Sequence, residues 1–463
     1  MISFFKRNTT PVISDRADHC ISRTNIDPDA LKVLYRLAGT GYTAYLVGGS
    51  VRDLLLGRQP KDFDIGTDAR PNEIRRLFRN CFLIGRRFRL AHVIFGQKVI
   101  ETSTFRRQPD NTDNGNSLYQ MEDNTFGTPE EDAKRRDFTV NGLFYDIKTF
   151  SVIDYVGGLK DLEKRVLRCI GDPNIRFRED PVRMMRAVKF AARLGFTIDR
   201  ASHKAIVKYH ADILNASVPR VCEEVFRLFG YGTSRAAFAL LWEFELLRDL
   251  LPDVSAYIDA SGGKNSPFWA YLAALDAAPG SADFSNDIRI ACLYYPLFLE
   301  RLRKEEADLP DGHANWQHIA RSMLYSAVQR LHISKSIFFD AVGLMSAPRR
   351  LASPPRQDRE HRFFSNPLFP KAMAFQRILF AAENKDPSPL NEWQAQYEQH
   401  IAQFPPRPGR RRPPPPEGQD AGEAPADDTG APPRSRRRSR RRRRPRGPAD
   451  GHRAEPESTE TAS

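Results

Sequence analysis

The chain has 463 residues, of which 40% are hydrophobic, and its formal net charge is +13 at pH 7. This length predicts two to four domains with buried cores, and no run of 18 apolar residues or secretion signal is present, so neither a membrane partner nor export is predicted. Five scattered cysteines without a Cys-x-x-Cys pair predict reduced thiols in a cytoplasmic protein and argue against a zinc site.

In chain order, residues 28–170 predict an α+β unit with a small mixed sheet. Apolar spacing indicates a helix over 28–41, and a strand over 42–47 leads through Gly48, Gly49 and Ser50 into a short helix that ends at Gly57. The later elements are a strand at KDFDIG (61–66), a helix over 71–80, a hairpin over 92–106, a polar mobile loop over 106–132, and two strands joined by a Gly-Gly turn within 151–171.

From residue 173 onward the apolar spacing is helical almost throughout. Helices are predicted over 180–194, 200–214, 219–230 and 234–248, with weaker ones up to about 398 and loops near 250–286 and 346–370. The second part of the chain is therefore predicted to be all-α.

The last segment, 401–463, is predicted to be a disordered basic tail. It is rich in proline and has almost no large apolar residue after Phe404, so it cannot offset the entropy of ordering. Ten of the 13 residues of 434–446 are arginine. A block of this density predicts a polyanion partner, RNA above all, although a purely solubilising tail remains an alternative. The arginines proposed to bind RNA are Arg436, Arg437, Arg438, Arg440, Arg441, Arg442, Arg443 and Arg444.

The strand KDFDIG carries two carboxylates, Asp62 and Asp64, on one side of an alternating pattern, with Phe63 and Ile65 on the other. Two such anions repel by roughly 4 kcal/mol at a separation of about 4 Å. A protonated acid, an interposed Lys or Arg, or a bound cation would each remove that repulsion. A solvated strand edge, where the repulsion is screened, is the simplest alternative.

The turn Gly48-Gly49-Ser50 precedes a helix whose first turn carries Arg52, an arrangement that suits a triphosphate as well as an ordinary tight turn. Followed by the acid pair, it predicts a divalent-ion site of carboxylates and substrate phosphates, with two Mg²⁺ ions as the cofactor. Glu101 and Asp137 are both candidates for a third acid.

Two further segments carry candidate binding residues. In REDPVRMMRAVKF, Asp180 is predicted to cap a helix that Pro181 begins, and Glu179, Asp180 and Arg183 could read a nucleobase without a template. A capped helix with an ordinary ion pair explains the same residues. In GRRFRL, Arg86, Arg87 and Arg89 are predicted to contact RNA.

The motifs LVGGSVRDLLLGRQPKDFDIGT, ETSTFR, EEDAKRRDFTVNGLFYD and GDPNIRFREDPVRMMRAVKFAARLGF resemble those of the class II tRNA nucleotidyltransferase/poly(A) polymerase family. They cover 42–196, and LIGRRFRLAHVIFG is similar to the bacterial poly(A) polymerase branch. The resemblance implies an extension over 1–27, a nucleotidyltransferase head over 28–170, a helical neck over 171–232, a helical body over 233–400 and the tail over 401–463.

By position, the resemblance implies that Asp62 and Asp64 bind the metal ions and that Asp137 is the third catalytic acid, with Glu101 as its competitor. Gly48, Gly49, Ser50 and Arg52 would contact the triphosphate. The implied activity is template-independent addition of AMP from ATP to RNA 3′ ends, linked to mRNA processing and decay, with decay proteins as possible partners of the tail. CCA addition to tRNA is the enzymatic alternative, and a non-catalytic RNA-binding adaptor is the alternative of another class.

We expect deletion of 405–463 to flatten the salt dependence of RNA binding, because each lost phosphate contact removes counterion release. Single-nucleotide transfer is expected to stay largely intact. Binding titrations of the full chain and the deletion variant between low and physiological salt check this. An unchanged slope would assign the arginine block to another purpose, such as docking a protein.

Overall fold

The computed structural model describes residues 10–85, 89–107, 126–309, 313–355 and 360–405. Met1–Pro406 form one compact unit, and the second unit, Arg407–Ser463, lies outside the described residues, as do the arginines predicted in the tail. Throughout the described ranges, every helix is too short or too polar to span a lipid bilayer.

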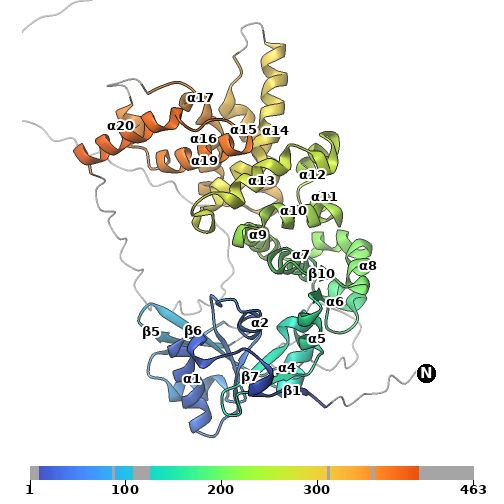
Figure 1. Cartoon of the computed structure of the whole chain (residues 1–463). Coiled ribbons are helices and arrows are strands. Elements are labelled where there is room, and N and C mark those ends of the chain that lie inside the picture. Colours follow the sequence, from blue (N-terminus) through green and yellow to red (C-terminus); the bar gives the residue numbers. More distant parts are fainter. Residues whose placement is uncertain (1–9, 86–88, 108–125, 310–312, 356–359, 406–463) are drawn as a thin grey trace, which may run out of the picture. The chain divides into compact units, whose positions relative to one another are not determined.

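A mixed eight-stranded sheet lies in the first part of the chain (Figure 1). Its strand order is β1-β8-β7-β2-β3-β6-β5-β4. All neighbouring strands are antiparallel except β3 and β6, which run parallel. The bounds are β1 Val12–Ser14, β2 Ala44–Val47, β3 Asp64–Thr67, β4 Cys81–Ile84, β5 Leu90–Phe95, β6 Lys98–Thr104, β7 Leu143–Asp146 and β8 Val152–Asp154. The predicted mixed sheet is confirmed.

Short helices accompany the sheet, and each begins where the sequence supplies a local signal. Asp27 accepts from the backbone N–H of Asp29 and Ala30 at the start of α1, and Pro28 occupies its first position. Buried residues three and four apart turn one face of α1 toward the core. The helices are α1 Pro28–Gly39, α2 Gly49–Leu55, α3 Pro71–Leu77, α4 Pro129–Arg135 and α5 Gly158–Glu163, with 3-10 turns η1 Arg16–Asp18, η2 Arg23–Asn25 and η3 Thr139–Asn141.

Two expectations in this part are wrong. The loop predicted over 106–132 lies mostly outside the described residues, at 108–125, and its predicted end is wrong, because Thr128 and Glu131 cap each other's backbone N–H groups and Pro129 begins helix α4. The predicted Gly-Gly turn near 157 leads into helix α5 rather than directly into a strand. A Cβ atom on Gly158 would lie 2.2 Å from the carbonyl oxygen of Thr139, so this close approach requires glycine.

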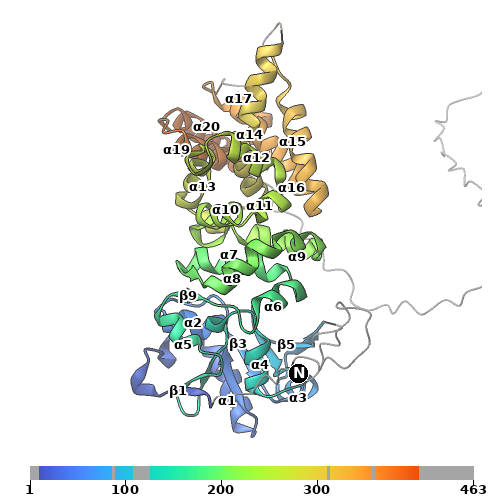
Figure 2. The same ribbon diagram turned by 90° about the vertical axis from the view of Figure 1, so that its right-hand side faces the viewer.

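The chain from Val166 to Gly232 packs helices α6–α9 between the sheet and the later helices (Figures 1 and 2). A two-stranded parallel sheet, β9 with β10, joins the end of the first part to this layer. The bounds are β9 Val166–Leu167, α6 Pro173–Glu179, α7 Val182–Leu194, β10 Thr197–Ile198, α8 Arg200–Tyr209, η4 His210–Asn215, α9 Val218–Arg227 and η5 Gly230–Gly232. Helix α6 was not predicted, since the first helix expected in this part begins at residue 180.

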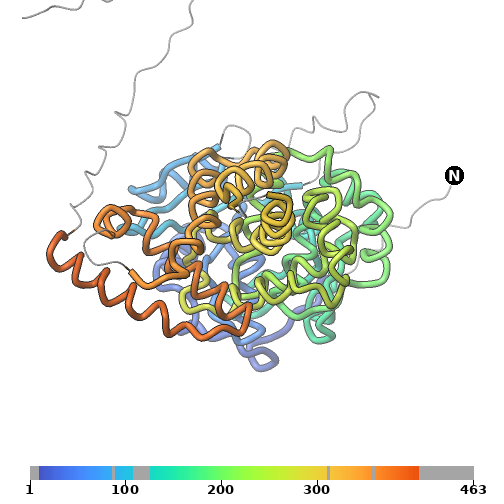
Figure 3. The backbone as a smooth tube through the Cα atoms, turned by 90° about the horizontal axis from the view of Figure 1, so that it is seen from above, coloured from blue at the N-terminus to red at the C-terminus, as the bar shows by residue number. Residues whose placement is uncertain are grey.

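The remaining described residues form the predicted all-α part (Figure 3). The two regions predicted to be loops also contain helices, because Pro252 and Pro348 stand at first helical positions, where proline is favourable. The bounds are α10 Ser234–Glu243, α11 Leu246–Leu250, α12 Pro252–Ala260, η6 Gly263–Asn265, α13 Phe268–Ala277, η7 Ser281–Asp283, α14 Asn286–Asp308, α15 Trp316–Leu331, α16 Lys335–Ser346, α17 Pro348–Leu351, α18 His361–Phe364, α19 Phe369–Ala382 and α20 Pro389–Gln403.

Buried hydrophobic residues from all parts of the compact unit, the first being Ile21 and the last Trp393, contact one another in a single core. A smaller cluster of Val47, Phe105, Ala133, Phe144 and Ile153 covers the other face of the sheet. Because the first core is shared, packing alone draws no boundary inside the compact unit, and the division into head, neck and body stays a prediction. The predicted head is 28–170, the predicted neck 171–232 and the predicted body 233–400.

Candidate active site

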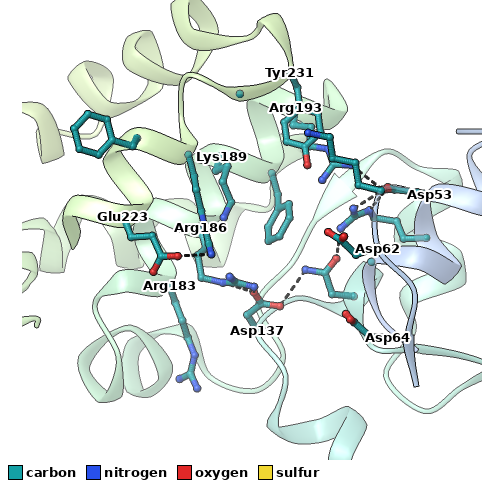
Figure 4. A pocket seen from close by; sticks show the side chains of 18 of the residues that line it. Asp53, Asp62, Asp64, Asp137, Arg183, Arg186, Lys189, Arg193, Glu223 and Tyr231 are labelled. Atoms are coloured by element: carbon teal, nitrogen blue, oxygen red, sulfur yellow. Dashed lines mark hydrogen bonds and ion pairs between the residues drawn. The ribbon is translucent and has the colours of Figure 1, made fainter. Parts of the chain in front are cut away.

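The two predicted acids line the same cavity, of about 1050 Å³, together with residues of α7 and α9 (Figure 4). Asp64 is the first residue of β3 and stands opposite Val47, whereas Asp62 lies just before the strand. Phe63 and Ile65 are buried, as the alternation predicted. Gly66 leaves the space that Phe105 fills on the face shared with Asp64, since a Cβ atom there would lie 2.6 Å from its ring.

Asp64 lies in an electrostatically unfavourable place. Among the described residues, neither Asp62 nor Asp64 has a cationic partner within ion-pair distance. Solvent reaches Asp64 through the mouth of the cavity, but protein atoms surround its other sides. Desolvation, followed by the nearby Glu101 and Asp62 carboxylates, raises the pKa of Asp64 to about 6, and Arg136 opposes the shift only partly. A cation bound to Asp64 would offset this repulsion between the carboxylates.

The residues present fit Mg²⁺, a hard ion that takes carboxylate oxygens and keeps positions for substrate phosphates. No group of three His, Cys, Asp or Glu side chains in the described ranges is close enough to form a complete metal site. Two carboxylates that need substrate oxygens to complete the coordination are consistent with that result. Asp62 and Asp64 are therefore the residues that would hold the ion.

The two candidates for the third acid occupy different environments. Glu101 neighbours Asp64 because Ile65 pairs with Thr102 in the parallel β3–β6 ladder, and it is half-exposed. Asp137 lines the cavity but is buried and accepts from Asn141, from the Phe138 backbone and from Arg186, whose Nε lies 2.8 Å away.

The contacts of Asp137 outweigh its desolvation. The Arg186 guanidinium and the hydrogen bonds lower the pKa of Asp137 to about 2, although burial alone would raise it. Asp137 is therefore a permanent anion whose oxygens are already engaged, and the competition between Asp137 and Glu101 stays open.

The predicted triphosphate cradle is only partly turned toward the cavity. Gly49, Ser50 and Arg52 line it, but Gly48 stands behind them with φ of 73°, packed against Arg136. The Ser50 hydroxyl donates to the carbonyl oxygen of Val47 at 3.0 Å, so its side chain is used within the turn.

Arg52 is buried and bound on several sides. Its Nη2 lies 2.7 Å from Asp53, its Nη1 donates to the side-chain oxygen of Asn141, and its guanidinium lies 5.1 Å from the ring centre of Phe190. Burial lowers the pKa of Arg52, with Asp53 opposing the shift. Arg52 is thus placed to hold this wall of the cavity together as well as to face a ligand.

A continuous chain of polar contacts joins the head to helix α7 (Figure 4). Arg193 binds Asp53 at 2.7 Å, and Arg186 binds Asp137 at 2.6 Å. Arg52 and Asn141 link the two carboxylates. Arg186 and Arg193 stand two helical turns apart on one face of α7, a spacing visible in the sequence that was not used to predict the site.

The predicted base-reading residues are paired before any ligand binds. Glu179 accepts from Arg176 at 2.9 Å and from Arg183 at 3.3 Å. Asp180 accepts two hydrogen bonds from Arg220, at 3.1 and 2.8 Å. The predicted cap is wrong: Asp180 makes no side-chain bond to the start of α7, because its carboxylate turns to Arg220 instead.

The charge of the cavity is strongly positive. Its described lining holds eleven Arg or Lys side chains against six carboxylates. Such a wall raises the local concentration of polyanions. Arg89 is exposed and does not line the cavity in the described ranges, and Arg86 and Arg87 lie outside those ranges. Lining residues that sequence reasoning missed include Asp53, Arg136, Arg186, Lys189, Arg193 and Tyr231.

Comparison with known proteins gives two family matches. Residues 44–168 match the poly A polymerase head domain, and residues 195–258 match the probable RNA- and SrmB-binding site of polymerase A. These ranges contain β2 to β9 and α8 to the greater part of α12.

Among curated relatives, "Poly(A) polymerase I" of Escherichia coli is 45% identical over 304 residues, which are 62% of this chain and 64% of that protein. The Haemophilus influenzae protein of the same name is 43% identical over 51% of this chain and 54% of its own. The "CCA-adding enzyme" of Lactobacillus helveticus is 40% identical over 48% of this chain and 55% of its own. The chain thus spans less than two thirds of the length of each of these relatives.

Among solved structures, the Bacillus stearothermophilus CCA-adding enzyme in complex with CTP superposes with a TM-score of 0.59 and 27% identity. The match covers 82% of this chain and 84% of that one. A CCA-adding enzyme in its apo form II shares the fold, with a TM-score of 0.54 and 18% identity.

We expect Asp64→Asn to raise the melting temperature at pH 7 without added metal ions. The ordinary pKa of 3.8 is raised to about 6 in the folded state, so the folded protein loses stability as pH rises between these values. The gain should vanish near pH 4 and stay below about 1 kcal/mol, since solvent screens the side chain. Mg²⁺ should then stabilise the unsubstituted protein more than the variant. Equal melting curves at every pH and Mg²⁺ concentration would contradict this, and Asp308→Asn is the control.

Proposed function

We propose that this chain, which belongs to the class II tRNA nucleotidyltransferase/poly(A) polymerase family, adds AMP from ATP to RNA 3′ ends without a template. The observation that carries the proposal is the unpaired carboxylate pair, Asp62 and Asp64, in a cavity otherwise rich in arginine and lysine. One site thus combines oxygen donors for Mg²⁺ with cations for phosphates.

In this mechanism the RNA 3′-hydroxyl attacks the α-phosphorus of ATP, and pyrophosphate leaves. Mg²⁺ held by Asp62 and Asp64 would supply Lewis-acid stabilisation of the charge on the phosphoryl oxygens. The protein contributes position and charge: Gly49 allows close approach of the triphosphate, and Arg136 and Lys61 lie on the lining beside the acids.

The residues at the start of α7 are proposed to select the base. Arg183 lines the cavity and is oriented by Glu179, while Arg220 holds both oxygens of Asp180. A carboxylate held in this way presents a fixed hydrogen-bonding pattern to the incoming base, which supports selection of one nucleotide without a template. Glu179, Asp180 and Arg183 together with Gly48, Gly49, Ser50 and Arg52 make up the proposed nucleotide-binding set.

Asp137 is proposed as the third catalytic acid by its position in the family motif, and its contacts support an additional positioning role. By holding Arg186, it fixes α7 over the acid pair. The wider proposal places the enzyme in the cytoplasm, in polyadenylation linked to mRNA processing and decay, with the arginine-rich tail contacting RNA or decay proteins.

CCA addition to tRNA is the second candidate. The superposition with a CTP complex of a CCA-adding enzyme favours it, whereas the higher identity to proteins named poly(A) polymerase favours AMP addition. An RNA-binding adaptor without activity is disfavoured, because the acids it would not need are present and unpaired.

The deciding experiment incubates the purified chain with a short RNA, Mg²⁺ and each nucleoside triphosphate separately. Long A tails from ATP alone are expected, and CTP incorporation that stops on a tRNA lacking its end would establish the alternative. Asp62→Ala and Asp64→Ala should each lower AMP transfer by about 10³-fold, as losses of transition-state charge stabilisation do. RNA binding should survive, because the substitutions remove negative charge. Asp308→Ala is the control, and near-normal turnover in either variant would contradict the mechanism.

We expect Arg220→Ala to reduce the preference for ATP over CTP by about tenfold, because it releases the Asp180 carboxylate that is proposed to read the base, and a side-chain contact to a base contributes roughly 1–3 kcal/mol of discrimination. Arg220→Lys keeps the charge but not the paired geometry, so it should lose most of the preference as well. Ratios of kcat/KM for the two nucleotides check this. Unchanged ratios in both variants would remove Arg220 from base selection.

A further inference from the structure

An exposed aromatic side chain stands on the cavity wall beside the acid pair. Tyr231 lies in η5 between two glycines, and 47% of its surface is exposed. Its φ of 65° is in the left-handed region, which is unfavourable for a residue with a side chain. The ring is therefore held at the cavity despite an unfavourable backbone and little burial, a combination that points to a ligand.

Two cations flank this ring. The guanidinium carbon of Arg193 lies 3.8 Å from the ring centre, and Asp53 fixes Arg193 from behind at 2.7 Å. The ammonium nitrogen of Lys61 lies 5.4 Å from the same ring centre, and Lys61 precedes Asp62 in the chain. Arg193 and Lys61 lie over part of the ring, and the part that stays exposed can stack a flat base while the cations attract the phosphate attached to it.

The position of Tyr231 separates it from the proposed nucleotide-reading residues. In Figure 4, Tyr231 lies near Arg193 at the top of the pocket and Arg183 lies at its lower left, whereas Asp62 lies to the right of both. In the proposed reaction, ATP extends from Arg183 to the acids. The attacking hydroxyl must approach the α-phosphorus from the side opposite the leaving pyrophosphate. The wall near Tyr231 is thus left for the second substrate.

We propose that Tyr231, with Arg193 and Lys61, forms a subsite that stacks the 3′-terminal base of the RNA. The proposal rests on the proposed function and identifies where its acceptor binds. Stacking uses the face that all bases share, so it accepts any terminal base, as repeated addition without a template requires. The two cations neutralise phosphates next to that base.

The test measures RNA binding rather than turnover. Fluorescence anisotropy with a short 5′-labelled RNA, without nucleotide or metal ion, compares the unsubstituted chain with Tyr231→Ala and Tyr231→Phe. Loss of the ring should weaken binding by about tenfold, and Phe, which keeps it, should bind normally. Tyr325→Ala is the matched control, because Tyr325 is 59% exposed on α15 and does not line the cavity in the described ranges. The KM for ATP should not change.

A second RNA, ending in an abasic ribose that keeps its 3′-hydroxyl, tests the contact itself. The unsubstituted chain should bind it about tenfold more weakly than the intact RNA, whereas Tyr231→Ala should bind the two equally. Tyr231→Gly, which suits the positive φ, replaces the Ala variant if that protein melts early.

The subsite would be overturned if the Tyr231→Ala substitution and the abasic RNA end weakened binding independently, so that their effects added. Unchanged RNA binding of Tyr231→Ala, or an effect confined to the KM for ATP, would also overturn it. Binding that follows the expected cycle without any AMP transfer would instead keep the subsite and refute the proposed function. The two failures are therefore distinguishable.

Discussion

The arrangement of the cavity depends on two ion pairs between helix α7 and the sheet-bearing part of the chain. Arg186 binds Asp137 and Arg193 binds Asp53, and Arg52 with Asn141 connects the two carboxylates. Because these contacts are largely buried, removal of one partner would leave an uncompensated charge, which is far more costly than the loss of a surface ion pair. They therefore fix the distance between the acid pair on one wall and the base-reading segment on the other.

The same constraint gives the carboxylates of the cavity different properties. Asp137 is surrounded by donors and has a pKa lowered to about 2, whereas partial desolvation and neighbouring acids raise the pKa of the solvent-exposed Asp64 to about 6. A carboxylate that is already neutralised can position a helix, and a carboxylate that lacks a partner can bind a cation. The structure thus gives different electrostatic environments to carboxylates that look alike in the sequence.

Charge and shape together explain how two polyanions could share one site. The lining has a surplus of cations, so a triphosphate and an RNA end are both attracted, and the acids occupy the point where the two would meet. The proposed base selection would use a second group of side chains, in which Arg183 binds Glu179 and Arg220 binds Asp180. A ring at Tyr231 would serve the other substrate by stacking, which needs no base-specific contact.

The sequence by itself determined the mixed sheet, the following all-α part and the clustering of Asp62 and Asp64, since alternation, caps and motif spacing are local properties. It placed Phe63 and Ile65 in the core correctly, but it missed α5, α12 and α13, where proline and glycine begin or flank helices rather than loops. Only the tertiary structure decided which charges are neutralised. Arg186, Arg193 and Arg220 reach carboxylates between 40 and 140 residues away in the chain, and no local pattern specifies such partners. For the same reason Asp180 binds Arg220 instead of capping α7 as predicted. The place of Tyr231 beside Lys61 likewise depends on the tertiary structure.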